Sequence, residues 1–279
     1  MTARYLTAAV IRDLGAQLTT RDLEVLRRVS DLRFVSGSQL TRLHFADSSD
    51  AVANARAARR ALLRLVRLGC LERLARRVGG VRAGSAGFIY RLAPAGQRLG
   101  VERGWQPEGR RRRSHVPGTL FVDHALKVAE LHTLLVEADR SRIIELLTLD
   151  GEPACWRSYG GTHGQRCTLK PDSYVRLGVG AYEDSYFIEV DMGTEGSRAL
   201  ERQLKLYLDY EASGREQAER GVFPKTLWLA PDDERASVIE DCIARLPSSA
   251  QELFAVVLFA EAVRAVSTHQ MSNEHRTPA

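Results

Sequence analysis

The sequence has no apolar run of about 18 residues, the length that a membrane-spanning helix needs. Its first residues also lack the apolar core of a signal peptide, because Arg12 and Asp13 interrupt them. Cysteine is sparse, and there is no C-x-x-C pair among the four residues, Cys70, Cys155, Cys167 and Cys242. Scattered cysteines are typical of reduced thiols. We therefore expect a cytoplasmic protein without a membrane segment.

Lysine is almost absent, and the charges that remain are unevenly distributed. Residues 1–118 contain 23 arginines, no lysine and 9 acidic residues, a net charge of +14. Residues 119–279 contain 17 basic and 26 acidic residues, a net charge of −9. A bias toward arginine explains the few lysines but not the collection of acidic residues in the second half. The asymmetry indicates a cationic, nucleic-acid-binding half joined to an acidic half.

Three short helices are predicted near the N-terminus. Thr19 or Thr20 can cap a helix over residues 21–31. Ser36 and Gln39 have the spacing of a capping box that opens a second helix. A third helix is predicted over residues 50–68, capped by Ser48-Ser49 and ended by Gly69.

Two strands, over residues 71–78 and 87–92, follow the helices and are joined by a basic, glycine-rich tip that contains Arg82. Three helices followed by a hairpin predict a winged helix-turn-helix domain over residues 15–102. Its partner would be double-stranded DNA. The alternative is a winged helix that contacts proteins, for example in a homodimer.

The third helix is the one expected to enter the major groove. One side is apolar, and the other carries Asn54, Arg56, Arg59, Arg60, Arg64 and Arg67. Arginine pairs with guanine edges or phosphates, and asparagine pairs with adenine. A solvated arginine face without a nucleic-acid partner is the alternative interpretation.

Residues 103–118 are predicted to be a basic linker. Glycine, proline and four successive arginines (Arg110, Arg111, Arg112 and Arg113) cannot form a core. These arginines could follow a phosphate backbone, and they could also belong to a solvated hinge.

The C-terminal half predicts a mixed sheet flanked by helices. Helical spacing occurs over residues 121–138, 197–212 and 236–246. Strand-like runs occur at 143–149, at 167–169 continuing into 173–177, and at 186–190, 225–229 and 254–259. The fold class is therefore α/β, with the second domain over residues 119–266 and a polar, disordered tail over 267–279.

Three carboxylates in this half could hold Mg²⁺ or Mn²⁺. Asp172 begins one strand, while Glu189 and Asp191 are two residues apart on the next, so their side chains leave the same face. A cluster of carboxylates binds divalent cations and is typical of metal-dependent nucleases. Ordinary turn and strand-end roles are the alternative for each of the three residues.

The order of these elements resembles the restriction-endonuclease-like, or PD-(D/E)xK, core. Pro171-Asp172 and Glu189 match its acidic positions, and Asp191 stands where its lysine is expected. Gln203 and Tyr207 match the Q-x-x-x-Y variant of some of its nucleases. The resemblance implies catalytic roles for Asp172, Glu189, Asp191, Gln203 and Tyr207. Lys170 and Lys205 are the nearest replacements for the lysine, although Lys205 points away from Gln203 on a helix.

The chain is more similar still to the replication-relaxation family of actinobacterial plasmids and integrative elements. The similarity is carried by residues 90–96 (YRLAPAG), 123–126 (DHAL), Pro171-Asp172 and 189–195 (EVDMGTE), and it covers roughly residues 15–260. It implies a DNA-binding protein of mobile-element replication or transfer that could relax or nick DNA. Replication or transfer proteins would then be possible partners.

The sequence also raises three other functions or sites. An origin- or operator-binding initiator, accessory factor or transcriptional regulator would use the nuclease-like domain as a scaffold. A relaxase would use Tyr207 or Tyr210 as its nucleophile, but the chain lacks the paired-histidine motif that holds the metal of such enzymes. A zinc site of His163, Cys167 and Cys155 has irregular spacing and is not expected.

Overall fold

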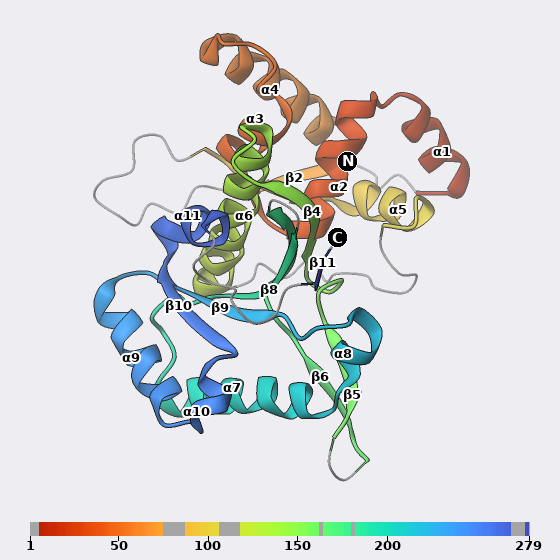
Figure 1. Ribbon diagram of the computed structural model, residues 1–279. Coiled ribbons are helices and arrows are strands. Elements are labelled where there is room, and N and C mark those ends of the chain that lie inside the picture. The colour runs from red at the N-terminus through yellow and green to blue at the C-terminus, as the bar shows by residue number, and fades with distance from the viewer. Residues whose placement is uncertain are drawn as a thin grey trace. The chain divides into compact units, whose positions relative to one another are not determined.

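The computed structural model describes residues 6–74, 87–105, 118–161, 164–179, 182–268 and 277–278 (Figure 1). The chain divides into two compact units, residues 1–133 (unit 1) and 134–279 (unit 2). The boundary lies within one helix, α6 (Thr119–Arg140). Helices and strands occur in both units, which confirms the predicted α/β class. In the part of the chain that is described, no helix is both long and apolar enough to cross a membrane.

Unit 1 consists of helices around a small antiparallel sheet. The three strands pair in the order β1-β3-β2, with Val35 opposite Tyr90 and Leu71 opposite Leu92. The elements before α6 are α1 (Ala8–Ala16), α2 (Thr20–Leu32), β1 (Val35–Ser36), α3 (Gly37–His44), α4 (Ala51–Arg67), β2 (Leu71–Leu74), β3 (Ile89–Leu92) and α5 (Pro94–Glu102). The three predicted helices and two predicted strands are therefore present, in the predicted order.

Helices α2 and α3 begin where their side chains satisfy the first backbone N–H groups. Thr19 and Asp22 form a capping box, in which the Thr19 N–H donates to Asp22 Oδ2 over 2.8 Å. Ser36 and Gln39 form a second one, in which the Ser36 N–H donates to Gln39 Oε1 over 2.9 Å. Reciprocal caps of this kind are readable from sequence because both partners lie within one turn.

Helix α4 has a different cap from the predicted one. Asp50, rather than Ser48 or Ser49, caps it, because Asp50 Oδ1 accepts the N–H groups of Val52 and Ala53 over 2.8 and 3.1 Å. Ser48 Oγ instead accepts the Asp50 N–H over 3.0 Å. The helix ends as predicted, next to Gly69, whose φ of 71° is strained for other residues.

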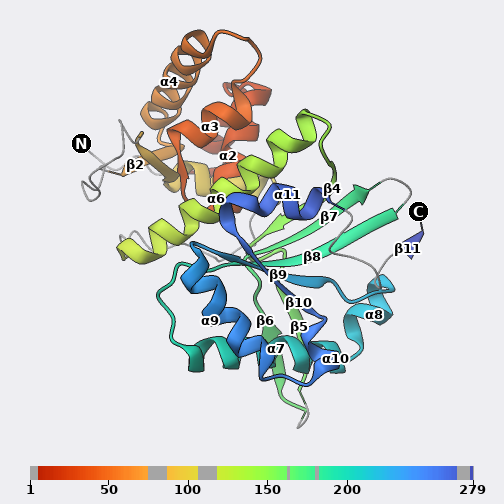
Figure 2. The same cartoon turned by 60° about the vertical axis from the view of Figure 1, so that its left-hand side comes forward.

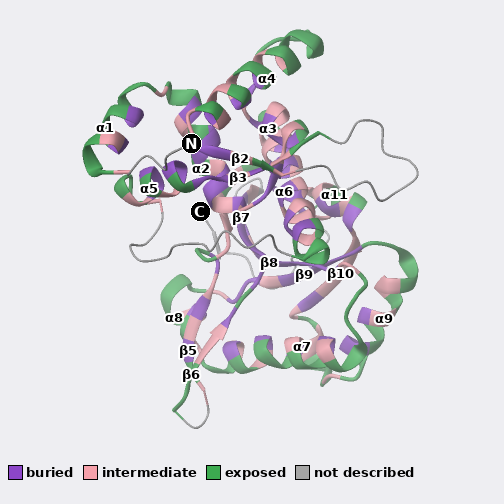
Figure 3. Cartoon of the chain, turned by 180° about the vertical axis from the view of Figure 1, so that it is seen from behind, coloured by how far each residue is buried: buried purple, intermediate pink, exposed green. Residues whose placement is uncertain are grey.

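Two helices of unit 1, α1 and α5, were not predicted. Helix α5 begins at Pro94 without a side-chain cap, so its start is marked by proline at the first helical position and not by a capping residue. Both helices contribute to the core of unit 1, in which the side chains of Ile11, Val25, Leu26, Leu40, Leu65 and Leu99 are buried. Figure 3 shows buried segments, in purple, on both α1 and α5.

Unit 2 is built on a mixed sheet in the order β10-β9-β8-β7-β4. Strands β8, β9 and β10 run parallel, and β7 runs antiparallel to both β8 and β4. A short strand at the C-terminal end pairs with β8. The strands are β4 (Glu145–Gly151), β7 (Ser173–Val179), β8 (Tyr182–Val190), β9 (Lys225–Ala230), β10 (Phe254–Leu258) and β11 (Thr277–Pro278).

Helices α7 and α9 pack side by side against one face of this sheet (Figures 1 and 2). Helix α7 has the predicted bounds, Ser197–Ala212, and its buried side includes Leu200, Leu204 and Tyr207. These side chains share a core with Phe187 and Trp228 of the sheet. The helices after α6 are α7, α8 (Arg215–Arg220), α9 (Asp233–Ala244), α10 (Ser248–Gln251), the 3₁₀ turn η1 (Phe259–Glu261) and α11 (Ala262–Ser267).

The continuous strand predicted through residues 167–177 is two strands. Strand β6 (Arg166–Leu169) pairs with β5 (Arg157–Gly160) in a separate two-stranded hairpin, and β7 starts only at Ser173. Pro171 lies between them, and proline has no N–H with which to continue a ladder. Strand β5 itself was not predicted.

Gly96 of α5 should not tolerate a side chain. A Cβ at this position would lie 2.2 Å from the Cys70 carbonyl oxygen, which is much closer than two non-bonded heavy atoms can approach each other. We expect Gly96→Ala to reduce the free energy of unfolding by about 1–3 kcal/mol, as overpacking does. Gly160→Ala, which meets nothing within 4 Å, is the control. Denaturant titration measures both, and equal stabilities would contradict the packing described.

His132 of α6 should make unit 1 sensitive to acid. Burial, reinforced by the charge of Arg28, lowers its pKa from 6.5 to about 3. Below pH 6.5 the unfolded chain binds a proton that the folded chain does not bind. Stability should therefore fall as pH falls from 6.5 toward 3, by roughly 1.4 kcal/mol for each pH unit. Thermal denaturation at pH 7 and pH 4.5 measures the loss. It should be smaller in His132→Phe, and an equal loss would contradict this role of His132.

Candidate functional sites

The first candidate site is a group of buried carboxylates on β7 and β8. Asp172 precedes β7, and its N–H donates to the Ile188 carbonyl of β8 over 3.1 Å. Its Oδ2 accepts the Val190 N–H over 2.8 Å, so the side chain is turned toward β8. Asp172 is 8% exposed and Glu189, on β8, is 5% exposed. The antiparallel pairing of the two strands thus brings these carboxylates together, 17 residues apart in sequence.

Helix α7 supplies the partners of Glu189. The Tyr207 hydroxyl donates to Glu189 Oε1 over 2.5 Å, and the side chain of Gln203 also makes a hydrogen bond with Glu189. Residues four apart on a helix lie on the same side, which explains how both reach one carboxylate. Burial, and then the charge of Asp172, raise the pKa of Glu189 well above its usual 4.5. The two neighbouring carboxyl groups, Asp172 and Glu189, therefore favour either a bound proton or a bound cation between them.

Asp191 is engaged elsewhere, by Arg235 in the first turn of α9. Arg235 Nε and Nη2 donate to the two carboxylate oxygens of Asp191, each over 2.7 Å. The Gly193 N–H adds a third bond, over 2.6 Å, to Asp191 Oδ1. Arg235 Nη1 donates to the Glu195 carbonyl over 2.8 Å. Sequence reasoning missed Arg235, which lies 44 residues away and carries no local motif.

The predicted metal ligands fit a divalent cation only in part. Asp172 and Glu189 lie together and offer the oxygen donors that Mg²⁺ and Mn²⁺ prefer. Asp191 does not fit, because both its oxygens are held by Arg235. Across the described ranges, no group of three or more His, Cys, Asp or Glu residues is arranged to hold a metal ion.

The two lysines named as replacements lie away from this arrangement. The Lys170 ammonium lies 4.8 Å from the centroid of the Trp156 ring. Lys205 is exposed on α7, while the side of that helix facing the core carries Tyr207. Asp191, which stands where a PD-(D/E)xK core would carry its lysine, is paired with Arg235.

Tyr207 and Tyr210 are poorly placed to act as nucleophiles. Both are fully buried, and burial is the largest cause that raises the pKa of each phenol. The Tyr207 hydroxyl donates to Glu189 and the Tyr210 hydroxyl donates to Glu216. A phenolate next to these carboxylates would be repelled by them. This geometry fits hydrogen-bond donors and opposes a relaxase with either tyrosine as its nucleophile.

The environments of Cys155 and Cys167 do not support the zinc site that was not expected from the sequence. Cys155 is buried, and its thiol donates to the Pro171 carbonyl over 3.0 Å. Cys167 is partly buried on β6, and His163 lies outside the described residues.

The second candidate site is the polar side of α4. Arg56, Arg59 and Arg60 are exposed and make no ion pair with any residue that the structure describes. Arg64 is different, because it pairs with the buried Asp22 of α2. Asn54 is also engaged, since its Nδ2 donates to the Ser48 carbonyl over 2.7 Å.

The remaining arginines predicted to bind DNA lie outside the described residues. They are Arg82, Arg110, Arg111, Arg112 and Arg113. Glu130, considered as a further carboxylate, belongs to unit 1, where it accepts hydrogen bonds from Gln39 over 3.0 Å and Arg42 over 2.5 Å.

The ion pair between Arg235 and Asp191 should contribute strongly to stability. Their side chains are 11% and 4% exposed, so Arg235→Ala would leave a buried carboxylate without its partner. We expect a loss of about 3–5 kcal/mol in the free energy of unfolding. Arg245→Ala, which removes a pair whose side chains are 64% and 44% exposed, is the control and should lose less than about 1 kcal/mol. Equal losses in urea unfolding would contradict a structural role for Arg235.

Comparison with known proteins identifies the family. A family described as replication-relaxation matches residues 26–226, which include the helices α3 and α4 and the carboxylates Asp172, Glu189 and Asp191. No curated protein and no solved structure gave a match. The match covers most of the chain and confirms the resemblance predicted from the sequence. The chain therefore belongs to the replication-relaxation family.

Proposed function

We propose that this protein binds double-stranded DNA in the replication or transfer of a mobile genetic element, with α4 as its DNA-reading helix. Family membership supports a role in replication or relaxation. The observation that carries the proposal is the composition and exposure of α4. The helix contains five arginines and no acidic residue, and Arg56, Arg59 and Arg60 are exposed.

The arrangement of unit 1 supports this role for α4. Helices α2, α3 and α4 are followed by the hairpin of β2 and β3, and β1 completes the sheet in the order β1-β3-β2. This order supports a winged helix-turn-helix, in which the third helix would lie in the major groove. Residues 51–56 of α4 bury no side chain, and the first buried residue of the helix is Ala58. The N-terminal half of α4 is therefore accessible to a groove.

The α4 residues divide into two roles under this proposal. Arg56, Arg59 and Arg60 are available for phosphates or base edges. Arg64 holds α4 against α2 through Asp22, and Asn54 fixes the loop before the helix through Ser48. We further propose Arg82 and the run Arg110–Arg113 as phosphate contacts on charge alone.

Loss of two exposed arginines of α4 should weaken DNA binding. We expect Arg59→Ala with Arg60→Ala to lower the affinity for duplex DNA and to reduce the slope of log affinity against log salt by about 2. Fluorescence anisotropy over a salt series measures both quantities.

The matched control is Arg198→Ala with Arg202→Ala, which removes the same charge from the exposed side of α7. This control should bind like the wild type. Equal weakening in both variants would contradict a specific role for α4, and no weakening in either would contradict the proposal.

A second candidate function is metal-dependent nicking of DNA, which the pairing of Asp172 with Glu189 favours. Asp172 and Glu189 would hold Mg²⁺ or Mn²⁺, and a bound cation would activate a water molecule and shield phosphate charge. Asp172 is oriented by the Val190 N–H, and Glu189 is oriented by Tyr207 and Gln203. Asp191 and Arg235 neutralise one another beside this pair. All three carboxylates are buried, and this favours a structural role for them in the domain over a catalytic role in nicking.

Nicking has a direct test on supercoiled plasmid with Mn²⁺ or Mg²⁺. If the second function holds, open circles should form only with metal, and they should be lost in Asp172→Asn and Glu189→Gln. These variants are isosteric with the native residues, so folding can be checked by their thermal midpoints. Tight DNA binding without strand breaks would exclude nicking and leave the DNA-binding function in place.

A further inference from the structure

The hairpin of β5 and β6 has two chemically different faces. The strands pair with Ser158 opposite Thr168 and Gly160 opposite Arg166. Because side chains alternate along a strand, residues of even number lie on one face and residues of odd number on the other. Trp156 and Lys170, which flank the two strands, continue the even-numbered face and contact each other, with the ammonium 4.8 Å from the ring centroid.

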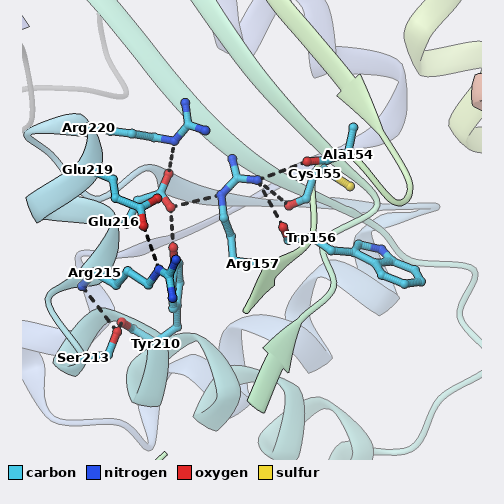
Figure 4. Close-up of polar contacts among 10 residues, drawn as sticks. All are labelled: Ala154, Cys155, Trp156, Arg157, Tyr210, Ser213, Arg215, Glu216, Glu219 and Arg220. Atoms are coloured by element: carbon cyan, nitrogen blue, oxygen red, sulfur yellow. Dashed lines mark hydrogen bonds and ion pairs between the residues drawn. The ribbon is translucent and has the colours of Figure 1, made fainter. Parts of the chain in front are cut away.

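The odd-numbered face is fixed to the core by a buried ion-pair network (Figure 4). Arg157 Nε donates to Glu216 Oε2 over 3.0 Å, and the Tyr210 hydroxyl donates to the same oxygen. Arg220 pairs with the other oxygen of Glu216 over 3.0 Å. Arg157 Nη1 also donates to the Cys155 carbonyl over 2.9 Å. The base of the hairpin is therefore held in one orientation on α7 and α8.

Aromatic packing reinforces this attachment. The guanidinium of Arg157 lies 4.6 Å from the centroid of the Tyr174 ring. The Tyr159 ring lies 5.2 Å from that of Tyr210, and Leu169 is buried in the same core. Figures 1 and 2 both show the hairpin extending past α7, away from the sheet of unit 2.

The even-numbered face carries two exposed cations among half-buried side chains. Arg166 and Lys170 are exposed and make no ion pair with any described residue. The hydroxyl oxygens of Ser158 and Thr168 lie 3.4 Å apart between them. No acidic residue occurs from Pro153 to Pro171, although residues 119–279 as a whole have an excess of acidic residues. The hairpin therefore supplies cations and no carboxylate of its own.

We propose that the even-numbered face of the hairpin, formed by Trp156, Ser158, Arg166, Thr168 and Lys170, is a second nucleic-acid contact that binds the phosphodiester backbone. Arginine, lysine and hydroxyl donors are the side chains that contact phosphate oxygens. A two-stranded ribbon also has dimensions that the major groove admits. The inference rests on the proposed DNA-binding function and extends it from unit 1 to unit 2.

The hairpin also leads into the carboxylates. Strand β6 continues through Lys170 and Pro171 to Asp172, and the Cys155 thiol at the start of the hairpin donates to the Pro171 carbonyl. Lys170 therefore lies two residues before Asp172 in the sequence, while its ammonium lies over the Trp156 ring. The hairpin would give unit 2 a DNA contact of its own.

The test uses the full chain with Arg166→Ala and Lys170→Ala combined, and the variant Arg198→Ala with Arg202→Ala as the control in the same unit. Anisotropy is measured over a salt series, with a labelled duplex and with a single strand of the same sequence. We expect about tenfold weaker binding and a salt slope smaller by roughly 2 in the hairpin variant on the duplex, with little change in the control. Both substituted residues are exposed, so the thermal midpoint should not change.

The single-stranded arm identifies the source of the phosphates. A loss on both DNA forms means that the hairpin binds any backbone, whereas a loss on the single strand alone assigns it to an unpaired strand. Unchanged affinity and slope on both forms would overturn the inference.

The outcomes also separate this inference from the function proposed for α4. Binding that depends on Arg59 and Arg60 but not on Arg166 and Lys170 overturns the hairpin alone. The reverse dependence overturns the role of α4 and supports the hairpin. A wild-type chain that binds neither DNA form overturns both.

Discussion

The burial of three carboxylates on and beside β8 is the constraint on which unit 2 depends. Each carboxylate is satisfied by a different neighbouring element. The backbone of β8 holds Asp172, α7 holds Glu189 through Tyr207, and α9 holds Asp191 through Arg235. A buried carboxylate without such partners would be strongly destabilising. The same charges that resemble a nuclease site therefore also fasten both helices to the sheet.

Local signals in the sequence predicted the elements that begin or end by local interactions. The capping boxes at Thr19 and Ser36, the glycine stop at Gly69 and the bounds of α7 could all be read from neighbouring residues. Helix α5 and strand β5 were not predicted. The start of α5 is marked by Pro94 and not by a capping side chain, and β5 is fixed by its partner β6.

In the candidate site too, contacts set by nearby residues were predicted and a contact with a distant residue was not. The i, i+4 spacing of Gln203 and Tyr207 predicted that both would reach one face, and both contact Glu189. The spacing of Glu189 and Asp191 predicted a shared role, yet Asp191 pairs with Arg235, 44 residues away. A partner at that distance is determined by how α9 packs on the sheet, which no short motif encodes.

The distribution of charge links the two proposed DNA contacts. Helix α4 and the sequence from Pro153 to Pro171 both contain cations and no acidic residue. In each case the arginine that lies nearest the core is neutralised by a buried acid, Arg64 by Asp22 and Arg157 by Glu216. The exposed arginines Arg56, Arg59, Arg60 and Arg166 make no ion pair with a described residue, which leaves them available to phosphates.

The central claim, that α4 meets DNA, has a direct measurement in photocrosslinking of the full chain to duplex DNA. A photoreactive residue at Val52, which is 58% exposed in the first turn of α4, is compared with one at Ile143, which is also 58% exposed and lies just before β4. The account predicts DNA adducts from position 52 and few or none from position 143. Equal adducts from both positions, or adducts from position 143 alone, would contradict it.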